Sequence, residues 1–528
     1  PWLGLFFYEA YLKGRNMFCK SYCAAVIGVD ARIVQIEADV NDGMPIFQMV
    51  GYLNSEVREA KERVRSAIKN IGWGFPAKRV TVNISPADFK KEGTAYDLGI
   101  AVALLCSFGR IQCDKLDQIL FAGELSLNGK VNSINGVLPI VLAAKERGFK
   151  YCIVPACNVN EGAIVSGIKT IGTDSLQESV DIIEKECFDE MAVPNEEWKS
   201  NYSACMSKDF SDISGQPMVK RAAMLAIAGG HNMLMTGPPG SGKTMIAERL
   251  PGIMPGLTMK ESIEVSKIYS SSGKFTETKG FVYERPFRAP HHSISPAGLI
   301  GGGISPYPGE ISYAHRGVLF MDELTEFKRD TVELLRTPLE KKYIEHTRNN
   351  VTIRYPSDFV LVAAMNPCPC GYYPDKSKCS CTPLQINRYL SKLSYPLLDR
   401  IDIVSQVQSV KYASINSQDK DIYTTSYIRE RVNAMRSIQN KRFNNDRITL
   451  NSEMNLFHIK KYCVLDDECK NFMENVFEKL SLSVRGYNKI LKVARTIADS
   501  EECDNITINH LKEAVIYRSF DRQIKEVM

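Results

Sequence analysis

Alternating apolar and polar positions predict β-strands in the first third of the chain. Residues 31–37 and 78–84 both alternate, so every second side chain would face the same side of a sheet. Between them, apolar residues in 55–71 recur at helical spacing with charged residues on the other face, which predicts an amphipathic helix. The apolar run in 96–105 predicts a buried helix. Residues 17–184 are therefore expected to form an independent α/β domain.

The rest of the chain divides into a linker, a second α/β unit and a helical end. Residues 185–209 are polar and acidic without clear periodicity, which indicates a linker. Residues 210–410 again combine strand and helix patterns, and residues 411–528 are dominated by helical periodicity. Residues 1–16 precede the first methionine and are expected to be a translated leader or an expression remnant.

The composition is that of a globular protein and excludes several classes. Apolar residues make up 44% and charged residues 24% of the 528 residues, which excludes disorder, collagen-like repeats and coiled coil as the dominant character. The net charge of +5 neither requires nor excludes DNA, so any affinity for it has to come from local patches. No apolar run approaches the roughly 18 residues of a membrane helix. The 15 cysteines, without a secretory signal, indicate reduced thiols in a cytoplasmic protein.

A glycine-rich segment matches the phosphate-binding loop pattern G-x-x-x-x-G-K-[ST] without a mismatch. A short apolar strand at 232–235 precedes it and a helix can open at 244, which disfavours a chance glycine turn. In this pattern Lys243 reaches the β/γ-phosphates of a nucleotide and Thr244 ligates Mg²⁺. The predicted nucleotide-binding residues are Gly237, Pro238, Pro239, Gly240, Ser241, Gly242, Lys243 and Thr244.

Two further apolar strands end in polar residues that suit ATP hydrolysis. The strand at 318–321 ends in Asp322 and Glu323, which are expected to hold Mg²⁺ and to act as general base for the attacking water. The strand at 359–364 ends near Asn366, which is expected to hold the water or the γ-phosphate. Alone, such residues would be ordinary strand ends, but Lys, Asp-Glu and Asn in this order after three apolar strands resemble the organisation of an AAA+ ATPase.

Two arginines stand where AAA+ proteins use this residue against a nucleotide. Arg400 follows a proline at a predicted helix end, the place of the arginine finger, and Arg485 opens a helix as sensor 2 does. Arginine suits both roles because it stays charged and binds phosphate through two donors. The alternative is that both are solvated surface arginines.

Several longer motifs resemble one family, the magnesium-chelatase-like AAA+ proteins of the ComM (YifB) branch. The stretches that carry the resemblance include Pro76-Ala-Lys-Arg-Val-Thr-Val-Asn83, Arg288-Ala-Pro-His-His-Ser-Ile-Ser295, Met365-Asn-Pro-Cys-Pro-Cys-Gly371 and Lys492-Val-Ala-Arg-Thr-Ile-Ala498. The resemblance implies a Lon-like (S5-type) α/β N-terminal domain, an AAA+ P-loop α/β core and a helical C-terminal lid. It also implies a hexamer that uses ATP and Mg²⁺ to translocate DNA, with branch migration in homologous recombination or natural transformation.

Two rival functions follow from the same resemblance. A Lon-type protease needs a serine–lysine dyad, but the chain has Thr94 near the serine position and Leu138 at the lysine position. Without the lysine, a hydroxyl has no general base, so peptidase activity is disfavoured. A magnesium-chelatase-type motor subunit for metal insertion would need partner subunits, and no porphyrin pocket is evident in the sequence.

Four cysteines cluster in one loop of the predicted core. Cys368, Cys370, Cys379 and Cys381 are spaced C-x-C–x8–C-x-C, so four thiolates could hold a structural Zn²⁺ tetrahedrally. The spacing departs from the common C-x2-C knuckle, and reduced thiols or a redox pair remain the alternatives.

A charged segment between the acid pair and Asn366 is the candidate DNA contact. Residues 339–353 are expected to form a strand–turn–strand hairpin that the family places toward a central pore. Lys341, Lys342 and Arg348 would then bind DNA phosphates without sequence preference. The alternative is a solvated charged hairpin.

Overall fold

The computed structural model describes residues 18–194, 208–275, 281–303, 306–348, 351–408 and 422–518. The chain divides into two compact units. Unit 1 holds residues up to 199 together with 262–282 and 345–354, and unit 2 holds the others. The segment 1–16, expected to be a leader, lies outside the described residues. Within the described ranges, no helix is both long and apolar enough to cross a lipid bilayer.

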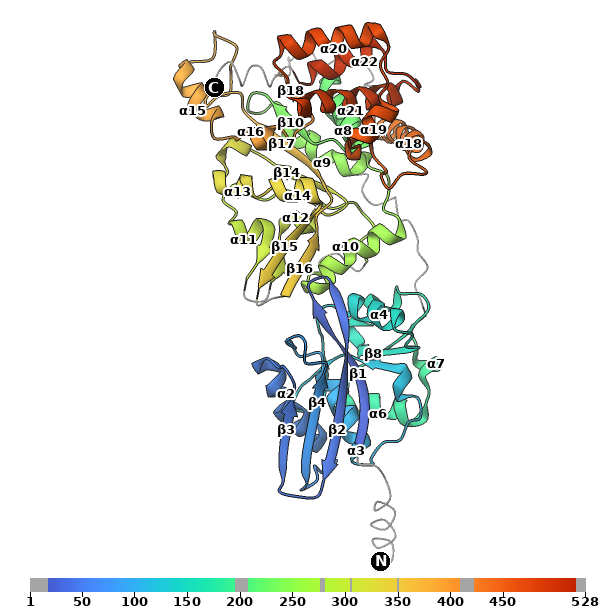
Figure 1. Cartoon of the computed structure of the whole chain (residues 1–528). Coiled ribbons are helices and arrows are strands. Elements are labelled where there is room, and N and C mark those ends of the chain that lie inside the picture. Colours follow the sequence, from blue (N-terminus) through green and yellow to red (C-terminus); the bar gives the residue numbers. More distant parts are fainter. Residues whose placement is uncertain are drawn as a thin grey trace, which may run out of the picture. The chain divides into compact units, whose positions relative to one another are not determined.

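A mixed seven-stranded sheet forms the centre of unit 1, in the order β3-β4-β2-β1-β5-β8-β9 (Figure 1). β1, β2 and β4 are antiparallel neighbours, and the remaining pairs are parallel. The predicted alternation is confirmed in β2, where Val34, Ile36 and Ala38 are buried. The strands are β1 (Phe18–Ile27), β2 (Asp30–Asn41), β3 (Ile46–Val50), β4 (Arg79–Ser85), β5 (Ile119–Phe121), β8 (Tyr151–Pro155) and β9 (Lys169–Thr173).

Helices pack against this sheet and extend into the predicted linker. The expected amphipathic and buried helices are α2 (Ser55–Asn70) and α3 (Asp97–Ser107), and they are followed by α4 (Val137–Glu146), α5 (Val159–Ala163) and α6 (Leu176–Lys185). The segment expected to be a linker from residue 185 begins with a further short helix, α7 (Phe188–Met191). Phe188 is buried and its ring lies 4.9 Å from that of Tyr151. This burial keeps the start of the predicted linker on unit 1.

A parallel five-stranded sheet forms the centre of unit 2, in the order β11-β14-β17-β10-β18. The strands are β10 (Met233–Thr236), β11 (Phe287–Arg288), β14 (Val318–Met321), β17 (Val360–Met365) and β18 (Ile403–Gln406). The three strands predicted to carry the nucleotide chemistry, β14, β17 and β10, are neighbours. Their carboxyl ends therefore meet at one edge of the sheet, where ligands bind in open α/β folds.

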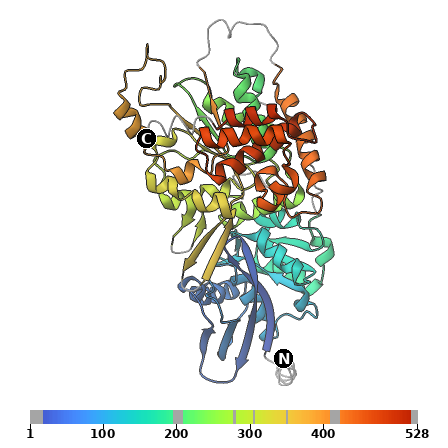
Figure 2. The same cartoon turned by 45° about the horizontal axis from the view of Figure 1, so that its top comes forward.

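The C-terminal helices share a hydrophobic core with the sheet of unit 2. The predicted helical periodicity is confirmed by α18 (Thr425–Arg442), α19 (Leu456–Tyr462), α20 (Asp467–Lys479), α21 (Val484–Ser500) and α22 (Ile508–Ile516). Val432 and Ile497 of these helices belong to the same buried cluster as Met233 and Ile246. Figures 1 and 2 both show the orange-to-red helices beside the green α8 (Pro217–Gly229). The helical end of the chain is thus part of unit 2.

The chain leaves unit 2 in two excursions that belong to unit 1. The first includes most of α10 (Met259–Ser271), and the second is the middle of the hairpin β15 (Tyr343–Arg348) and β16 (Val351–Pro356). The hairpin begins later than expected, because residues 339–341 belong to the helix α14 (Arg336–Lys341). Pro338 lies buried in the first turn of α14, a position where its fixed φ favours a helix.

Candidate functional site

Lys243 is the first residue of α9 (Lys243–Ile253), directly after the glycine-rich loop. Its Nζ donates to the carbonyl oxygens of Gly237 and Pro238 at 2.8 and 2.9 Å, and to Asn366 Oδ1 at 3.2 Å. Burial lowers the pKa of Lys243, and the nearby carboxylates of Asp322 and Glu323 oppose this shift. The ammonium therefore lies in a pocket that favours a strong anionic partner.

The glycine-rich loop leaves an open cradle at the start of α9. Gly240 and Gly242 have φ values of +73° and +91°, and a Cβ built at either would meet no atom within 4 Å. Such left-handed glycines turn backbone N–H groups inward, as phosphate binding requires. Ser241 Oγ is buried with no hydrogen-bond partner among the described residues. The loop thus offers an orphaned hydroxyl and a helix N-terminus, which fit a nucleotide phosphate.

The predicted acid pair, Asp322 and Glu323, lies at the same edge of the sheet, after β14. Thr244 Oγ1 donates to Asp322 Oδ2 at 2.8 Å, so the two residues expected to hold Mg²⁺ already touch. Hydroxyl and carboxylate oxygens are the ligands this hard cation prefers. Glu323 follows in a left-handed conformation, φ +51°, and its N–H donates to Asp322 Oδ1 at 2.9 Å. The two adjacent carboxylates thus have different surroundings, since Asp322 is bonded to Thr244 and Glu323 lines a cavity with Asn366.

A second group of residues lines a cavity next to Glu323. The cavity has a volume of about 470 Å³ and includes Glu323 and Asn366, with Arg388 and Lys392 from α15 (Pro383–Leu390) and the residues after it. His292 Nδ1 lies 3.8 Å from Glu323 Oε2. His292 lies in the motif of residues 288–295 that carries the family resemblance, which was the available signal for it, whereas no sequence pattern indicated Arg388.

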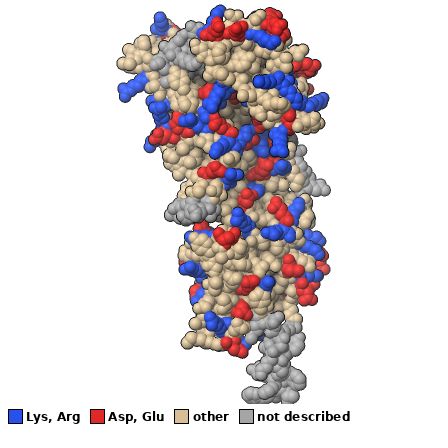
Figure 3. All heavy atoms as spheres, in the orientation of Figure 1, with Lys and Arg blue, Asp and Glu red and all other residues tan. Residues whose placement is uncertain are grey.

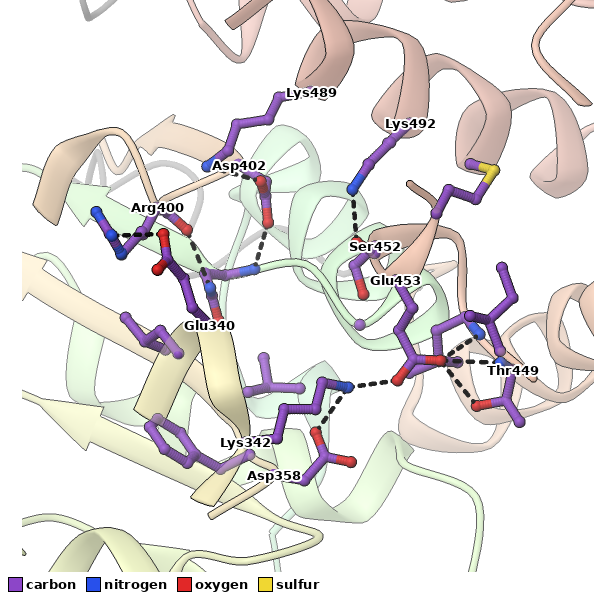
Figure 4. A pocket seen from close by; sticks show the side chains of 18 of the residues that line it. Glu340, Lys342, Asp358, Arg400, Asp402, Thr449, Ser452, Glu453, Lys489 and Lys492 are labelled. Atoms are coloured by element: carbon purple, nitrogen blue, oxygen red, sulfur yellow. Dashed lines mark hydrogen bonds and ion pairs between the residues drawn. The ribbon is translucent and has the colours of Figure 1, made fainter. Parts of the chain in front are cut away.

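Arg400 and Arg485 lie in a different pocket of unit 2, with a volume of about 730 Å³ (Figure 4). Arg400 donates to Glu340, and its Nε is buried without a partner in the described part of the chain. Arg485 is 73% exposed and its Nη1 lies 3.6 Å from Asp399 Oδ2. None of the described phosphate-loop residues lines this pocket. Arg485 therefore lies beside Asp399 and Arg400 beside Glu340, in a pocket that the described P-loop residues do not line.

Acidic and basic side chains alternate inside this pocket. Figure 4 shows Lys489 beside Asp402, with 3.0 Å between Nζ and Oδ1. Burial alone would raise the pKa of Asp402, but Lys489 and His231 hold it well below its usual range. Basic and acidic side chains are also interspersed on the face visible in Figure 3. Any phosphate contact here comes from particular arginines and lysines rather than from a broad positive field.

The three candidate DNA contacts differ in their surroundings. Lys342 forms ion pairs with Asp358, at 2.9 Å, and with Glu453, and it lies between them in Figure 4. Its charge is thus committed within unit 2, which weakens the case for Lys342 as a DNA contact. Lys341 is exposed, with its Nζ 5.8 Å from the ring centre of Tyr343. Arg348 ends β15, and its side chain lies outside the described residues.

The four clustered cysteines come together in space. The Sγ atoms of Cys368, Cys370, Cys379 and Cys381 all lie within 4.8 Å of one another. The distances from Cys368 to Cys370 and Cys379 are 3.3 and 3.8 Å, and Cys370 lies 3.5 Å from Cys379. A hydrogen bond with the backbone of Tyr372, helped by the other thiols, lowers the pKa of Cys370 to about 6. The cluster has the composition and compactness of a thiolate metal site.

Other residues, Thr94 and Leu138, stand at the positions where a protease would carry its serine–lysine dyad. Thr94 Oγ1 donates to the Glu124 carboxylate. Leu138 is fully buried, and its N–H donates to Glu161 Oε1 at 2.9 Å. No lysine stands at Leu138 to act as a base, so the geometry disfavours peptide hydrolysis.

Comparison with known proteins covers nearly the whole chain. Family models match residues 36–158 (Subunit ChlI of Mg-chelatase), 209–415 (Magnesium chelatase, subunit ChlI) and 423–518 (Magnesium chelatase, subunit ChlI C-terminal). Competence protein ComM of Haemophilus influenzae is 40% identical over 512 residues, 96% of this chain and 98% of that protein. The uncharacterized protein YifB of Escherichia coli is 40% identical over 498 residues, 94% and 96% of the two chains. Lon protease 2 of Bacillus subtilis is 29% identical over 167 residues, 30% of this chain and 29% of that protein.

Proposed function

Since this chain belongs to the ComM branch of the magnesium-chelatase-like AAA+ family, we propose that it is a ring-shaped ATPase that translocates DNA. The substrate is single-stranded or branched DNA, and the step is branch migration in homologous recombination or natural transformation. The name of the Haemophilus influenzae relative, a competence protein, supports this setting. The observation that carries the ATPase is the assembly of Lys243, Thr244, Asp322 and Asn366 at one sheet edge.

The residues at this edge divide the work of ATP hydrolysis. The backbone amides of the loop and Lys243 bind the β- and γ-phosphates. Thr244 and Asp322 hold Mg²⁺, which would neutralise charge on the phosphate oxygens. Glu323 accepts a proton from the attacking water as general base. Asn366, already bonded to Lys243, orients the γ-phosphate or the water.

Arg400 and Arg485 act on the nucleotide of a neighbouring subunit. They share a pocket that none of the chain's described P-loop residues lines, which favours action across an interface over action within one chain. Guanidinium groups stabilise the charge that develops on the transferred phosphoryl group. A site completed by the next protomer closes into a ring by repetition, and we propose a hexamer.

DNA contacts come from the end of α14 and from the hairpin that follows it. Lys341 and Arg348 are the proposed phosphate contacts, and Lys342 is set aside because it pairs with Asp358 and Glu453. The proposed cofactors are ATP and Mg²⁺, with a structural Zn²⁺ at the four cysteines. The 14 described cysteines have free thiols, which supports a reducing, cytoplasmic setting.

An ATPase assay with and without DNA tests the proposed function. We expect turnover to rise on adding single-stranded DNA, duplex or a four-way junction, with the strongest response to branched or single-stranded DNA. If none of the three DNAs binds the protein or changes its ATP turnover, DNA is not the substrate. Activation only by further chelatase subunits would favour the alternative, a metal-insertion motor.

A further inference from the structure

The cysteine loop, residues 367–382, ties three parts of the nucleotide site together. Cys368 and Cys370 follow the end of β17 and lie two and four residues after Asn366. Cys381 directly precedes Thr382, whose side chain and that of Gln385 form the capping box that starts α15. One pair of cysteines is thus attached to the strand that carries Asn366, and the other pair to the helix that carries Arg388.

The loop also presses on the phosphate-binding loop. A Cβ at Gly371 would come within 2.5 Å of Pro239 Cδ, so Gly371 packs against the proline ring more closely than a residue with a side chain could. Gly371 has φ +85°, and its N–H donates to the carbonyl oxygen of Cys368 at 3.0 Å. The position of Cys368 therefore sets where the loop meets Pro239.

The helix after the cysteine loop forms a wall of the cavity beside Glu323. Tyr389 is nearly buried, and Thr325 Oγ1 donates to its hydroxyl at 2.6 Å. Thr325 lies two residues after Glu323. The N-terminal end of α15 has its capping box next to Cys381, so the cluster holds one end of this wall and Tyr389 holds the other.

The sulfur geometry fits one tetrahedral metal ion. With Zn–S bonds of about 2.3 Å, tetrahedral thiolates lie about 3.8 Å apart, and the separations of 3.3, 3.5 and 3.8 Å are close to this value. Cys368 is fully buried, and its sulfur accepts the N–H of Tyr373 at 3.4 Å. On binding, each coordinated thiol gives its proton to solvent, and no other reactant is needed.

We propose that the cysteine loop is a zinc-thiolate brace whose metal occupancy sets nucleotide affinity at the P-loop. This inference rests on the proposed nucleotide site and goes beyond it, because it couples a metal to that site. Without the ion, residues 367–382 lose their cross-link, and Pro239, Asn366 and α15 are no longer held against one another. Because coupling between two binding sites is reciprocal, nucleotide must also tighten the metal.

The test measures zinc and ADP binding in the full-length protein. We expect one zinc per chain by elemental analysis, and a rise in the ADP dissociation constant of about tenfold or more when a chelator removes it. Adding zinc back should restore ADP affinity, which separates loss of the brace from irreversible unfolding. Bound ADP should slow the loss of zinc to the chelator. Protein that is purified with reduced thiols and neither contains nor binds zinc would overturn the proposal, as would zinc removal that leaves ADP affinity unchanged.

Variants distinguish the effect of zinc on ADP binding from the effect of the contact between Gly371 and Pro239. Cys379→Ser/Cys381→Ser should lose zinc and bind ADP weakly, whereas Cys157→Ser, an exposed cysteine of unit 1, should change neither. Gly371→Ala should keep zinc but weaken ADP binding, because the added methyl group meets Pro239. Gly148→Ala is its control, with a similar φ of +83° and open space around the Cβ.

Failure of the zinc proposal can be distinguished from failure of the proposed function as a DNA-dependent ATPase. Lys243→Ala should lose ADP binding and keep zinc, since Lys243 touches no cysteine in the described structure. The experiment measures ADP affinity and not DNA-dependent turnover. It therefore tests the zinc-thiolate brace even if the protein does not respond to DNA. Zinc lost together with ADP binding in Lys243→Ala would point to general unfolding and overturn the separate role of the cluster.

Discussion

Glu323 occupies an unusual backbone position for a residue with a side chain. Its φ of +51° lies in the left-handed region that few residues other than glycine, asparagine and aspartate adopt. Such local strain concentrates at functional sites. Here Asp322 accepts a hydrogen bond from Thr244, whereas Glu323 lines the cavity that contains Asn366, so that one acid is available for a cation and the other for water.

Replacing Glu323 by glutamine tests this division. We expect Glu323→Gln to bind ATP about as tightly as the wild type, because the phosphate contacts of Lys243 and the loop remain. Turnover should fall by about 10²-fold or more, since the amide cannot accept the proton. Single-turnover hydrolysis and nucleotide binding check the two parts, and normal turnover would remove Glu323 as the base.

Asp97 is a buried carboxylate of unit 1 whose protonation affects stability. It accepts hydrogen bonds from Arg63 at 2.6 and 3.0 Å and from the N–H of Leu125. Burial nevertheless raises the pKa of Asp97 to about 6, above the value of about 4 in an unfolded chain. Protonation of Asp97 therefore stabilises the folded state. This contribution is complete below pH 4 and is lost as the pH rises through 6.

We therefore expect the free energy of unfolding of Asp97→Asn, relative to that of the wild type, to be higher at pH 7 than at pH 4. The relative gain is on the order of 1–3 kcal/mol, because the amide has no charge to bury. Urea unfolding followed by the fluorescence of the three tryptophans, one of which is Trp73 of unit 1, gives the free energy of unfolding at each pH. Parallel pH curves for the two proteins would show that Asp97 does not titrate in this range.

At the scale of elements, two adjacent lysines at the end of α14 have different surroundings. Lys341 is exposed on the helix, whereas Lys342 adopts a left-handed conformation and pairs with Asp358 and Glu453. Glu453 lies 111 residues further along the chain. Lys342 thus connects the start of the hairpin to the C-terminal helices within unit 2.

The two lysines should respond differently to alanine. Lys341→Ala should weaken DNA binding and reduce its salt dependence, because one phosphate contact is lost, and leave basal ATP hydrolysis near normal. Lys342→Ala should lower the thermal unfolding midpoint by roughly 2–4 °C with a smaller effect on DNA. Salt titrations of DNA binding and thermal melts of both variants provide the comparison. Equal DNA affinity for Lys341→Ala and wild type would exclude Lys341 as a contact.

The elements that the sequence predicted are those defined by local pattern. The phosphate loop, the acid pair and Asn366 each follow a short apolar strand, and parallel strands bring such ends together without further information. The pairing of Arg400 with Glu340, and of Lys342 with Glu453, depends on residues 60 and 111 positions apart. No periodicity encodes such pairs, so the sequence predicted an arginine finger at Arg400, with a solvated arginine as the alternative, and a DNA contact at Lys342, without indicating either partner. The end of α14, residues 339–341, was predicted as part of the hairpin, since its charged residues suit a strand equally well.

At the scale of the whole molecule, the separation of the arginines from the P-loop predicts complementation between defective chains. Lys243→Ala protomers lack nucleotide binding but keep both arginines, and Arg400→Ala protomers have the reverse defect. Mixing equal amounts should restore about a quarter of the sites, because a heterologous interface pairs one intact P-loop with one intact finger. ATP hydrolysis of the mixture, against each variant alone, measures this recovery.

The double variant Lys243→Ala/Arg400→Ala is the control for this mixing experiment. Mixed with either single variant, it should restore no sites, since no interface then combines both intact parts. Recovery that is absent in the first mixture, although the chains assemble, would place Arg400 at the nucleotide of its own chain.

The pocket that holds Arg400 and Arg485 without any described P-loop residue also has a genetic consequence. If each hydrolysis centre is shared, a finger-deficient copy silences only the centre of its neighbour, whereas a copy that has lost both its P-loop and its finger silences its own centre and that of its neighbour. A cell that makes both normal and doubly defective copies would then lose more activity than the fraction of defective copies suggests. Such alleles would behave as dominant, and their severity would rise with the dosage of the defective gene.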